Sequence, residues 1–319
     1  MSEEKTIKNN EISGSAVKDV YWGEFSEELL DKIIGCYQSG RFDDADDIIK
    51  SLDREDFIFG LGRSDFLFYL PLGKTSKVLD VGCGLGVHSF NAAKIAGEVY
   101  GCDLSKKRVD FCNLRKQREE VKNISFLHSD IENLPFESET FDAVILNGVV
   151  EWLGEKNKNK NPRDDQIEDL RRVKALLKPG GILYIGIENR IALSYLFKAR
   201  DHNDLKYTTF MPRFAASFVS RLKRGKSYRT YTYSKKGYER LLKDVGFDKT
   251  PDFYIAHPGY NLPQFLIPFQ DETALKFILN SMSIDKGTTG KVARLFTRIP
   301  FLRGIIRNFF YAYAIFVKK

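Results

Sequence analysis

Short apolar runs alternate with longer amphipathic stretches along most of this 319-residue chain. The apolar runs that predict β-strands cover 78–81, 98–102, 124–127, 141–147, 182–185, 253–256 and 311–317. The stretches with helical periodicity cover 26–38, 43–52, 86–96, 105–119, 165–178 and 234–245. Strands that alternate with helices form parallel sheets covered on both faces. The pattern therefore predicts an α/β fold, a mostly parallel seven-stranded sheet with helices on both faces.

The first predicted strand runs directly into a glycine-rich loop. Residues 78–86 read Val-Leu-Asp-Val-Gly-Cys-Gly-Leu-Gly, with Asp80 in the strand. Glycine lets the backbone turn tightly out of a strand and approach a nucleotide-like ligand, where a Cβ would clash. Dinucleotide-binding folds and many tight turns also have such loops, so the surrounding residues must identify the ligand.

Two residues beside the loop disfavour a pyrophosphate ligand. Val87 stands where a dinucleotide fingerprint has its third glycine. Asp80 brings a carboxylate near the ligand, where it would repel two phosphates and attract an ammonium or sulfonium group. S-adenosylmethionine carries both of these cationic groups, so it is the ligand that the loop favours.

Acidic residues also end the next two predicted strands. Asp103 follows 98–102, where a second-strand acid accepts hydrogen bonds from ribose hydroxyls. Asp130 follows 124–127, where it could accept a hydrogen bond from an adenine amino group. One such acid alone is typical of a turn or a cap. Three acids at three consecutive strand ends indicate an adenosine-type ligand.

Taken together, these residues resemble the class I S-adenosylmethionine-dependent methyltransferases over about residues 60–255. The matching segments are the loop 78–86, Tyr-Gly-Cys-Asp-Leu-Ser at 100–105, Asp130, Phe-Asp-Ala-Val-Ile-Leu-Asn at 141–147 and Leu-Lys-Pro-Gly-Gly at 177–181. The resemblance implies a Rossmann-like enzyme in which Asp80 and the glycine loop hold the methionine moiety, Asp103 the ribose and Asp130 the adenine. The cofactor-binding residues that it implies are Asp80, Gly82, Cys83, Gly84, Gly86, Asp103, Leu104, Asp130, Ile131 and Asn147.

Two functions from other classes stay open on the sequence. A nicotinamide-dependent oxidoreductase would share the glycine loop, although Val87 speaks against it. A non-catalytic relative could keep the fold and serve as a scaffold in a glycan-assembly complex. The presence of Asp80, Asp103 and Asp130 argues against lost cofactor binding but does not establish turnover.

The resemblance also predicts the order of the parts of the chain. A polar tail and a helical extension cover 1–59, the cofactor-binding core covers 60–256, and an insertion with a basic amphipathic segment and a closing strand covers 257–319. Because such sheets close with an antiparallel pair, we expect 311–317 beside 253–256. The extra segments would either cover the substrate pocket or pad the sheet.

Composition favours a cytoplasmic protein. The four cysteines, at 36, 83, 102 and 112, show neither metal-ligand spacing nor a disulfide pattern. The N-terminus is polar and charged, and no apolar run approaches the roughly 20 residues that span a bilayer. Residues 154–165 are polar and low in complexity, which predicts a solvated loop without a function of its own.

The formal net charge is +7, and basic residues gather in two stretches. The first stretch contains Arg213, Arg221, Lys223, Arg224, Lys226 and Arg229. In the second, basic and apolar residues alternate: Lys291, Arg294, Arg298, Arg303 and Arg307 with Leu295, Phe296, Ile299, Phe301, Leu302, Ile305 and Ile306. Such an amphipathic segment is suited to peripheral contact with an anionic membrane, here the inner membrane face. The alternative is that its apolar side packs on the domain.

The segment after the fourth strand disfavours a nucleic-acid acceptor. Methyltransferases of this fold that act on base amino groups have Asn or Asp followed by Pro-Pro and an aromatic residue, whereas residues 147–152 read Asn-Gly-Val-Val-Glu-Trp. A Pro-Cys pair is also absent there, so a cysteine nucleophile for cytosine methylation is not supported. RNA and other small molecules remain alternative acceptors.

A second resemblance concerns the acceptor. The segments that carry it are 63–72, 186–190, 199–202, 229–234 and 258–263. They look like a methyltransferase group found among bacterial surface-polysaccharide biosynthesis proteins. The resemblance implies methylation of a sugar hydroxyl, or of a phosphate on a glycan, and the glycan could be lipid-linked.

Methyl transfer chiefly requires alignment of the acceptor and exclusion of water, but a sugar hydroxyl must also lose its proton. The candidate bases, in order of preference, are His202, Glu188, Glu151 and His257. Each of them could instead hold the fold together through hydrogen bonds. Arg190 and Arg229 could clamp an acidic sugar or phosphate, or pair with carboxylates inside the fold.

Overall fold

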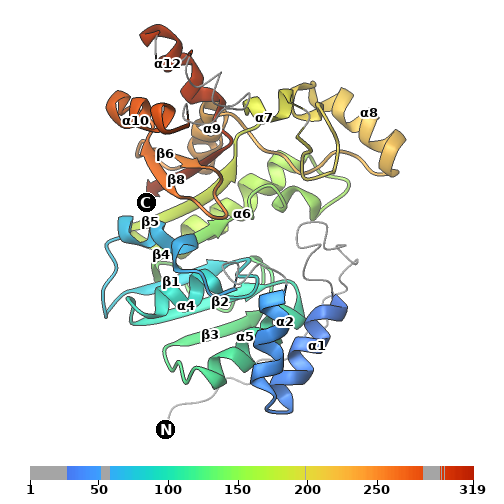
Figure 1. Ribbon diagram of the computed structural model, residues 1–319, viewed down its shortest axis with the longest axis vertical. Helices are drawn as coiled ribbons and strands as arrows, with labels where there is room; N and C mark the ends of the chain where they lie inside the picture. Colours follow the sequence, from blue (N-terminus) through green and yellow to red (C-terminus); the bar gives the residue numbers. More distant parts are fainter. Residues whose placement is uncertain (1–26, 52–57, 198, 283–294, 296, 298) are drawn as a thin grey trace.

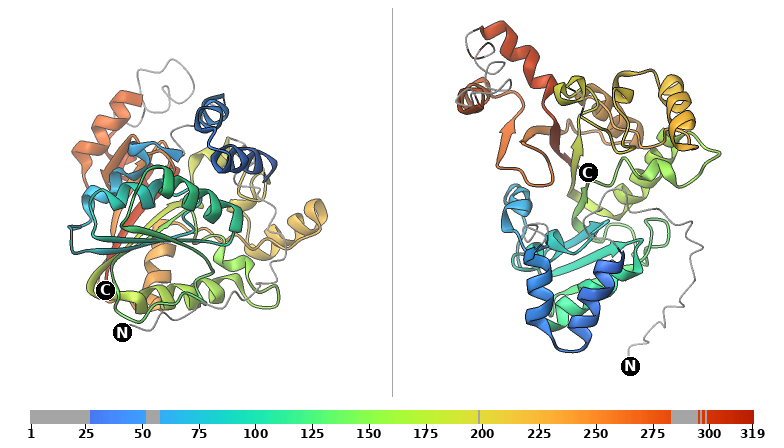
Figure 2. Two further views of the ribbon diagram at one scale, coloured as in Figure 1. Left: turned by 90° about the horizontal axis from the view of Figure 1, so that it is seen from below. Right: turned by 45° about the vertical axis from the view of Figure 1, so that its right-hand side comes forward.

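The computed structural model describes residues 27–51, 58–197, 199–282, 295, 297 and 299–319, built around one eight-stranded sheet (Figures 1 and 2). The strands are β1 (Lys77–Val81), β2 (Glu98–Asp103), β3 (Ile124–His128), β4 (Phe141–Asn147), β5 (Leu177–Glu188), β6 (Asp252–His257), β7 (Phe265–Pro268) and β8 (Ala312–Lys318). Their order is β3-β2-β1-β4-β5-β8-β6-β7. Strands β1 to β5 pair in parallel, and β8 is antiparallel to both β5 and β6.

This arrangement confirms the expected α/β, Rossmann-like sheet and its antiparallel closing pair. Seven strands lie where the apolar runs predict them, and β7 is an additional eighth strand that forms a hairpin with β6. The hydrophobic pattern did not predict β7, because this strand has only four residues and ends in Pro268, which cannot donate a ladder hydrogen bond.

Helices cover both faces of the sheet. The four that connect core strands are α4 (Val87–Ala93), α5 (Lys106–Arg118), α6 (Pro162–Leu176) and α9 (Lys235–Val245). Apolar side chains form two buried clusters, and neighbouring residues of one strand point into different clusters: Val78 into one and Leu79 into the other. Ser105 caps α5 by accepting from the Arg108 N–H, and Gly246 ends α9 with a φ of +100°.

The N-terminal helices α1 (Glu27–Gln38) and α2 (Phe42–Ser51) lie on the α5 side of the sheet. Arg118 of α5 forms a bidentate ion pair with Asp46, and Lys107 pairs with Asp31 at 2.8 Å. Of the two roles expected for this extension, these contacts favour padding of the sheet. None of the described helices is both long and apolar enough to cross a bilayer.

A further segment leaves the core between β5 and α9. It contains α7 (Leu193–Leu196), the short 3₁₀ helix η3 (Thr208–Phe210) and α8 (Arg213–Arg224). Figure 1 shows α8 at the outer edge of the molecule, away from the sheet. The sequence pattern did not predict these helices. Because the segment starts at the carboxyl end of β5, it lies where parallel sheets bind their ligands.

Candidate active site

The loop between β1 and α4 has the geometry expected of a cofactor loop. All three of its glycines are left-handed, with φ of +68° at Gly82, +55° at Gly84 and +82° at Gly86. A Cβ on Gly82 would lie 2.7 Å from a Cγ of Val149, so the loop passes directly against the segment that follows β4. Both conditions favour glycine, because other residues are strained at positive φ and would clash here.

Asp80 is a buried carboxyl at the end of β1. It accepts a hydrogen bond from Ser89 Oγ at 2.5 Å. Burial raises the pKa of Asp80 to about 7, Asp103 adds to that effect, and the bond from Ser89 opposes it. A cationic ligand group nearby would restore its ionised form. The buried Arg63 also acts on Asp80, so Ser89 and Arg63 belong to the site although the sequence assigned them no role.

Asp103 and Asp130 lie at the ends of β2 and β3. The two Asp103 oxygens accept from the Gly84 and Ser105 N–H groups, at 2.9 and 2.8 Å. Asp130 Oδ1 accepts from the Asn133 N–H at 2.9 Å. The sheet order places both acids beside Asp80 on one edge.

The other expected cofactor residues surround these acids. Leu104 follows Asp103 and is 61% exposed, whereas Ile131 is buried. The Cys83 N–H donates to the Cys102 carbonyl at 2.9 Å; Cys112 and burial raise the pKa of the Cys83 thiol well above its usual range. Asn147 Oδ1 accepts from the Tyr184 hydroxyl at 3.3 Å. Carboxylates at three strand ends, an exposed apolar side chain and a loop with three left-handed glycines fit an adenosyl ligand with a cationic end.

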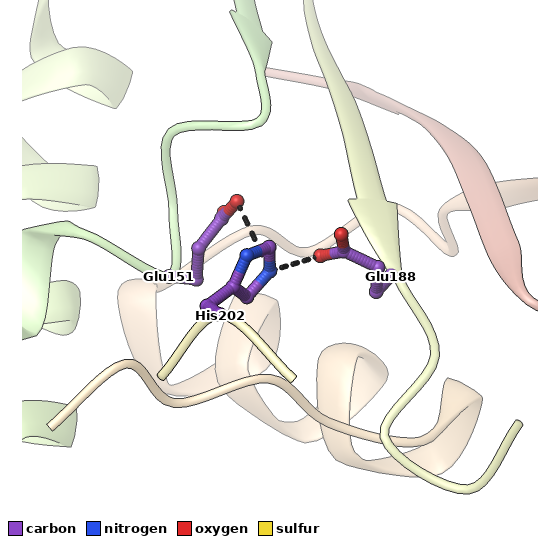
Figure 3. A group of neighbouring side chains, drawn as sticks. All are labelled: Glu151, Glu188 and His202. Atoms are coloured by element: carbon purple, nitrogen blue, oxygen red, sulfur yellow. Dashed lines mark hydrogen bonds and ion pairs between the residues drawn. The ribbon is translucent and has the colours of Figure 1, made fainter. Parts of the chain in front are cut away.

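Glu151, Glu188 and His202 come together beyond the carboxyl ends of β4 and β5 (Figure 3). His202 Nε2 is hydrogen-bonded to the Glu188 carboxylate and lies 3.6 Å from Glu151 Oε1. The Tyr311 hydroxyl donates to the other Glu188 oxygen at 3.2 Å. The three candidate bases ranked first in the sequence therefore form one cluster, and Tyr311 is a member that the sequence did not suggest.

The pKa values of His202 and Glu151 are both raised in this cluster. Burial lowers the pKa of His202, but Glu188 and Glu151 outweigh burial and raise that pKa to about 9. Burial raises the pKa of Glu151 to about 8, Glu188 adds to the rise and His202 opposes it. Within the described part of the chain, neither oxygen of the fully buried Glu151 has a hydrogen-bond partner. An unpaired buried carboxyl costs free energy, so this carboxyl is available to a ligand.

A metal ion is one ligand that this cluster could hold. One ligand atom from each of Glu151, Glu188 and His202 lies within 4.8 Å of the others, and carboxylate oxygens with an imidazole nitrogen suit several divalent metals. The fourth candidate base, His257, is not in the cluster. It lies at the end of β6 with its ring 6.0 Å from that of Phe310, and burial lowers its pKa.

Both arginines considered as clamps are bound inside the fold. Arg229 donates to backbone carbonyls of residues 154–160 and to Asp165 Oδ2, and Arg190 donates to the Thr209 and Met211 carbonyls, each at 2.6 Å. Of the expected solvated loop 154–165, residues 156–159 are exposed, whereas 162–165 form the first turn of α6 and Asp165 is buried. The loop nevertheless has a structural partner that was not predicted, because its carbonyls bind Arg229.

Residues 72–236, just over half of the chain, match the model of a family described as a methyltransferase domain. The chain belongs to the methyltransferase domain family. This match confirms the expected enzyme class, and with it S-adenosylmethionine as the cofactor of this methyltransferase.

The relatives of this methyltransferase match only part of its length. The chain is 31% identical over 114 residues to the uncharacterized protein RP028 of Rickettsia prowazekii, covering 35% of this chain and 42% of that protein. It is 33% identical over 121 residues to a ubiquinone biosynthesis O-methyltransferase of Vibrio parahaemolyticus, covering 38% and 47%. The matched region spans less than half the length of these relatives.

Similar solved structures include a SAM-dependent methyltransferase from Aquifex aeolicus, which is 16% identical, with 85% of this chain and 96% of that chain covered and a TM-score of 0.45. Another is phosphoethanolamine N-methyltransferase 2 of Haemonchus contortus in complex with S-adenosyl-L-methionine. It is 17% identical, with 92% and 58% covered and a TM-score of 0.49.

Proposed function

We propose that this methyltransferase methylates an oxygen of a glycan, either a sugar hydroxyl or a phosphate, and that His202 accepts the proton when the acceptor is a hydroxyl. The observation that carries the proposal is the imidazole held against two carboxylates at the carboxyl ends of β4 and β5, the sheet edge that also bears the cofactor loop. The relatives named O-methyltransferases support an oxygen acceptor. The sequence segments similar to polysaccharide-biosynthesis methyltransferases support a glycan.

The cofactor side is proposed to use acids and one buried arginine. When bound, S-adenosylmethionine supplies an electrophilic methyl carbon. Asp80 would attract the ammonium and sulfonium charges, and Arg63 would bind the carboxylate of the methionine moiety. Asp103 would accept from the ribose hydroxyls, and Asp130 with the Ile131 N–H would bind the adenine edge.

The acceptor side is proposed to centre on His202. As the hydroxyl oxygen of the acceptor takes the methyl group, its proton passes to His202 Nδ1, because Nε2 faces the Glu188 carboxylate and donates to it. Glu188 stabilises the resulting imidazolium, and Tyr311 fixes the Glu188 carboxylate. Glu151 would accept a hydrogen bond from a second hydroxyl of the acceptor, which satisfies an oxygen that has no hydrogen-bond partner among the described residues. Burial of all three groups excludes water from the reacting oxygen.

The pH dependence separates the two acceptor chemistries. A hydroxyl must lose its proton, so transfer should increase as His202 becomes neutral, near pH 9. A phosphate needs no base and would bind the protonated imidazole, so transfer to a phosphate should decrease over the same range. The sign of the slope therefore identifies the class of acceptor oxygen.

The test is transfer of labelled methyl from S-adenosylmethionine to a panel of nucleotide sugars, lipid-linked glycans, small phenols and RNA. We expect label in a glycan, at least a hundredfold less with His202→Asn, and little change with His257→Asn, the matched histidine outside the cluster. Label in phenols or RNA alone would refute the glycan. Loss of activity with a chelator and its recovery with Mn²⁺ would assign the cluster to a metal ion and remove His202 as the base.

A further inference from the structure

Helix α8 presents its large apolar side chains to solvent. Phe214, Phe218 and Leu222 are 79%, 64% and 72% exposed, whereas the small residues Ala216 and Ser220 are fully buried. The three large side chains recur every four residues, so they form one stripe along the helix. A helix that only packs on a domain turns its large apolar side inward. Packing within the described part of the fold therefore does not explain the stripe on α8.

Along the sequence, the charged residues of α8 and its flanking segments have a single sign. The sequence has no acidic residue from 205 to 238 but nine lysines and arginines there. Arg221, Lys223 and Lys226, beside the C-terminal half of the stripe, are all exposed. Arg213 is an exception, because its guanidinium stacks on the Tyr231 ring at 4.0 Å.

A basic cavity adjoins the C-terminal end of α8. Its volume is about 410 Å³, and its lining includes Arg200, Lys206, Lys223 and Arg224 with one acid, Asp204. Arg200 pairs with Asp204, and Arg224 donates to the Asn203 side chain, so the two lysines supply the remaining charge of this lining. The cavity is built partly from the loop that carries His202.

We propose that α8 docks this protein on an anionic phospholipid surface, with the stripe of Phe214, Phe218 and Leu222 among the acyl chains and the flanking cations on the headgroups. Apolar side chains beside unopposed cations match both layers of such a surface. A two-fold contact with a second copy fits less well, because it would bring two basic helices together. The proposal stands on α8 alone and does not require a glycan acceptor.

This assignment differs from the one made on the sequence, which placed membrane contact at 291–307. Lys291, Arg294, Phe296 and Arg298 of that stretch lie outside the described residues. Within α12 (Pro300–Ile306) and just after it, Arg303 and Arg307 both contact Glu272, Arg307 at 3.1 Å, and Ile306 is buried. Phe301 of α12 is 75% exposed, so the two segments differ chiefly in charge: Arg303 and Arg307 contact an acid, whereas Arg221, Lys223 and Lys226 beside the stripe of α8 are exposed.

Co-sedimentation of the full chain with vesicles tests the proposal. The vesicles are phosphatidylcholine alone or phosphatidylcholine with about a third phosphatidylglycerol. We expect binding to the anionic vesicles that falls at least tenfold in Phe214→Ser/Phe218→Ser/Leu222→Ser and that weakens with salt. Phe68→Ser is the matched control, because Phe68 is 81% exposed on the helix η1 (Leu61–Tyr69), away from α8. It should bind as the wild type does.

Three results would overturn the proposal: no binding of the wild type to anionic vesicles, equal binding to both kinds of vesicle, or equal binding of the triple variant. If the triple substitution instead splits a dimer in solution, the stripe is a contact between copies. Transfer to a water-soluble acceptor provides the independent readout. It should be unchanged in the triple variant, so failure of membrane docking and failure of the proposed chemistry are distinguishable.

Discussion

The two halves of the carboxyl edge of the sheet differ in how their acids are satisfied. At β1 and β2, Asp80 and Asp103 accept hydrogen bonds from donors of the cofactor side itself, Ser89, Gly84 and Ser105. At the ends of β4 and β5, Glu151 and Glu188 face one imidazole from the segment inserted between β5 and α9, and both oxygens of Glu151 lack a hydrogen-bond partner within the described residues.

This difference separates a general cofactor site from a specific acceptor site. Hydrogen bonds within the cofactor side hold its acids before any ligand arrives, so the same loop can serve many enzymes of one fold. The acceptor cluster depends on an inserted segment and leaves a buried carboxyl to be satisfied by a ligand. Substitutions on the two sides should therefore affect different steps.

The largest effect is expected on the acceptor side. His202→Asn removes the group that takes the acceptor proton and should lower kcat by about 10²- to 10⁴-fold. Binding of S-adenosylmethionine, measured by calorimetry, should change less than twofold. A comparable loss of cofactor affinity would show that the two sides do not act separately.

The cofactor side should show the opposite behaviour. Asp103→Ala removes the proposed ribose acceptor and the bond that holds the Gly84 N–H, so the dissociation constant for S-adenosylmethionine should rise about 10- to 100-fold. At saturating cofactor, kcat should stay near the wild-type value. Asp110→Ala is the matched control, because Asp110 is a partly exposed acid on α5 that pairs with Lys106, and it should leave affinity unchanged. Unchanged affinity in Asp103→Ala would contradict the assignment.

The pH dependence of transfer to a hydroxyl tests the coupling inside the cluster. Glu188 is the main reason why the pKa of His202 is raised to about 9, so kcat/KM should increase up to about that pH. In Glu188→Gln the carboxylate charge is gone and burial lowers the pKa of His202, so the rise should shift to a lower pH. A profile that is identical in the two proteins would rule out His202 as the titrating base.

Substitution of Glu151 should have opposite effects on stability and on activity. Glu151→Met replaces a buried carboxyl without a hydrogen-bond partner by an apolar side chain of similar size, which should raise the free energy of unfolding by about 1 kcal/mol and lower activity. Asp165→Asn is the matched comparison. Asp165 is buried and paired with Arg229, so this substitution should lower the free energy of unfolding. Urea unfolding measures both. Destabilisation by Glu151→Met would assign Glu151 a structural role.

A smaller effect concerns stability and pH. Folded pKa values are raised to about 7 for Asp80, about 8 for Glu151 and about 9 for His202, so the folded protein binds more protons than the unfolded chain. Stability should therefore fall as the pH rises from about 5 to 9. Thermal unfolding should give a higher Tm at pH 6 than at pH 9. The reverse order would contradict these shifts.

The sequence predicted the cofactor half of the site well because its signals are local. Asp80, Gly84 and Asp103 are recognisable from their places at consecutive strand ends, and Gly246 ends α9 within the bounds that the helical pattern 234–245 predicts. The predicted site roles remain predictions, but the structure places every one of these residues on the expected edge.

Other features could not be predicted because they depend on contacts between distant segments. The sequence shows a basic residue at Arg229. Only the fold shows that its guanidinium donates hydrogen bonds to carbonyl groups of residues 154–160. The stripe on α8 has ordinary helical spacing. Whether Phe214 faces the core or the solvent depends on what packs beneath Ala216.

The measurement that tests the account most directly is thermal stability with S-adenosylmethionine, S-adenosylhomocysteine and NAD in parallel, for the wild type and Asp80→Ala. A ligand at a hundred times its dissociation constant stabilises by about 2.7 kcal/mol, which is readily seen as a rise in Tm. We predict that the first two ligands raise the Tm of the wild type, that NAD does not, and that the rise is reduced in Asp80→Ala. Stabilisation by NAD alone, or by none of the three, would contradict the proposed cofactor site.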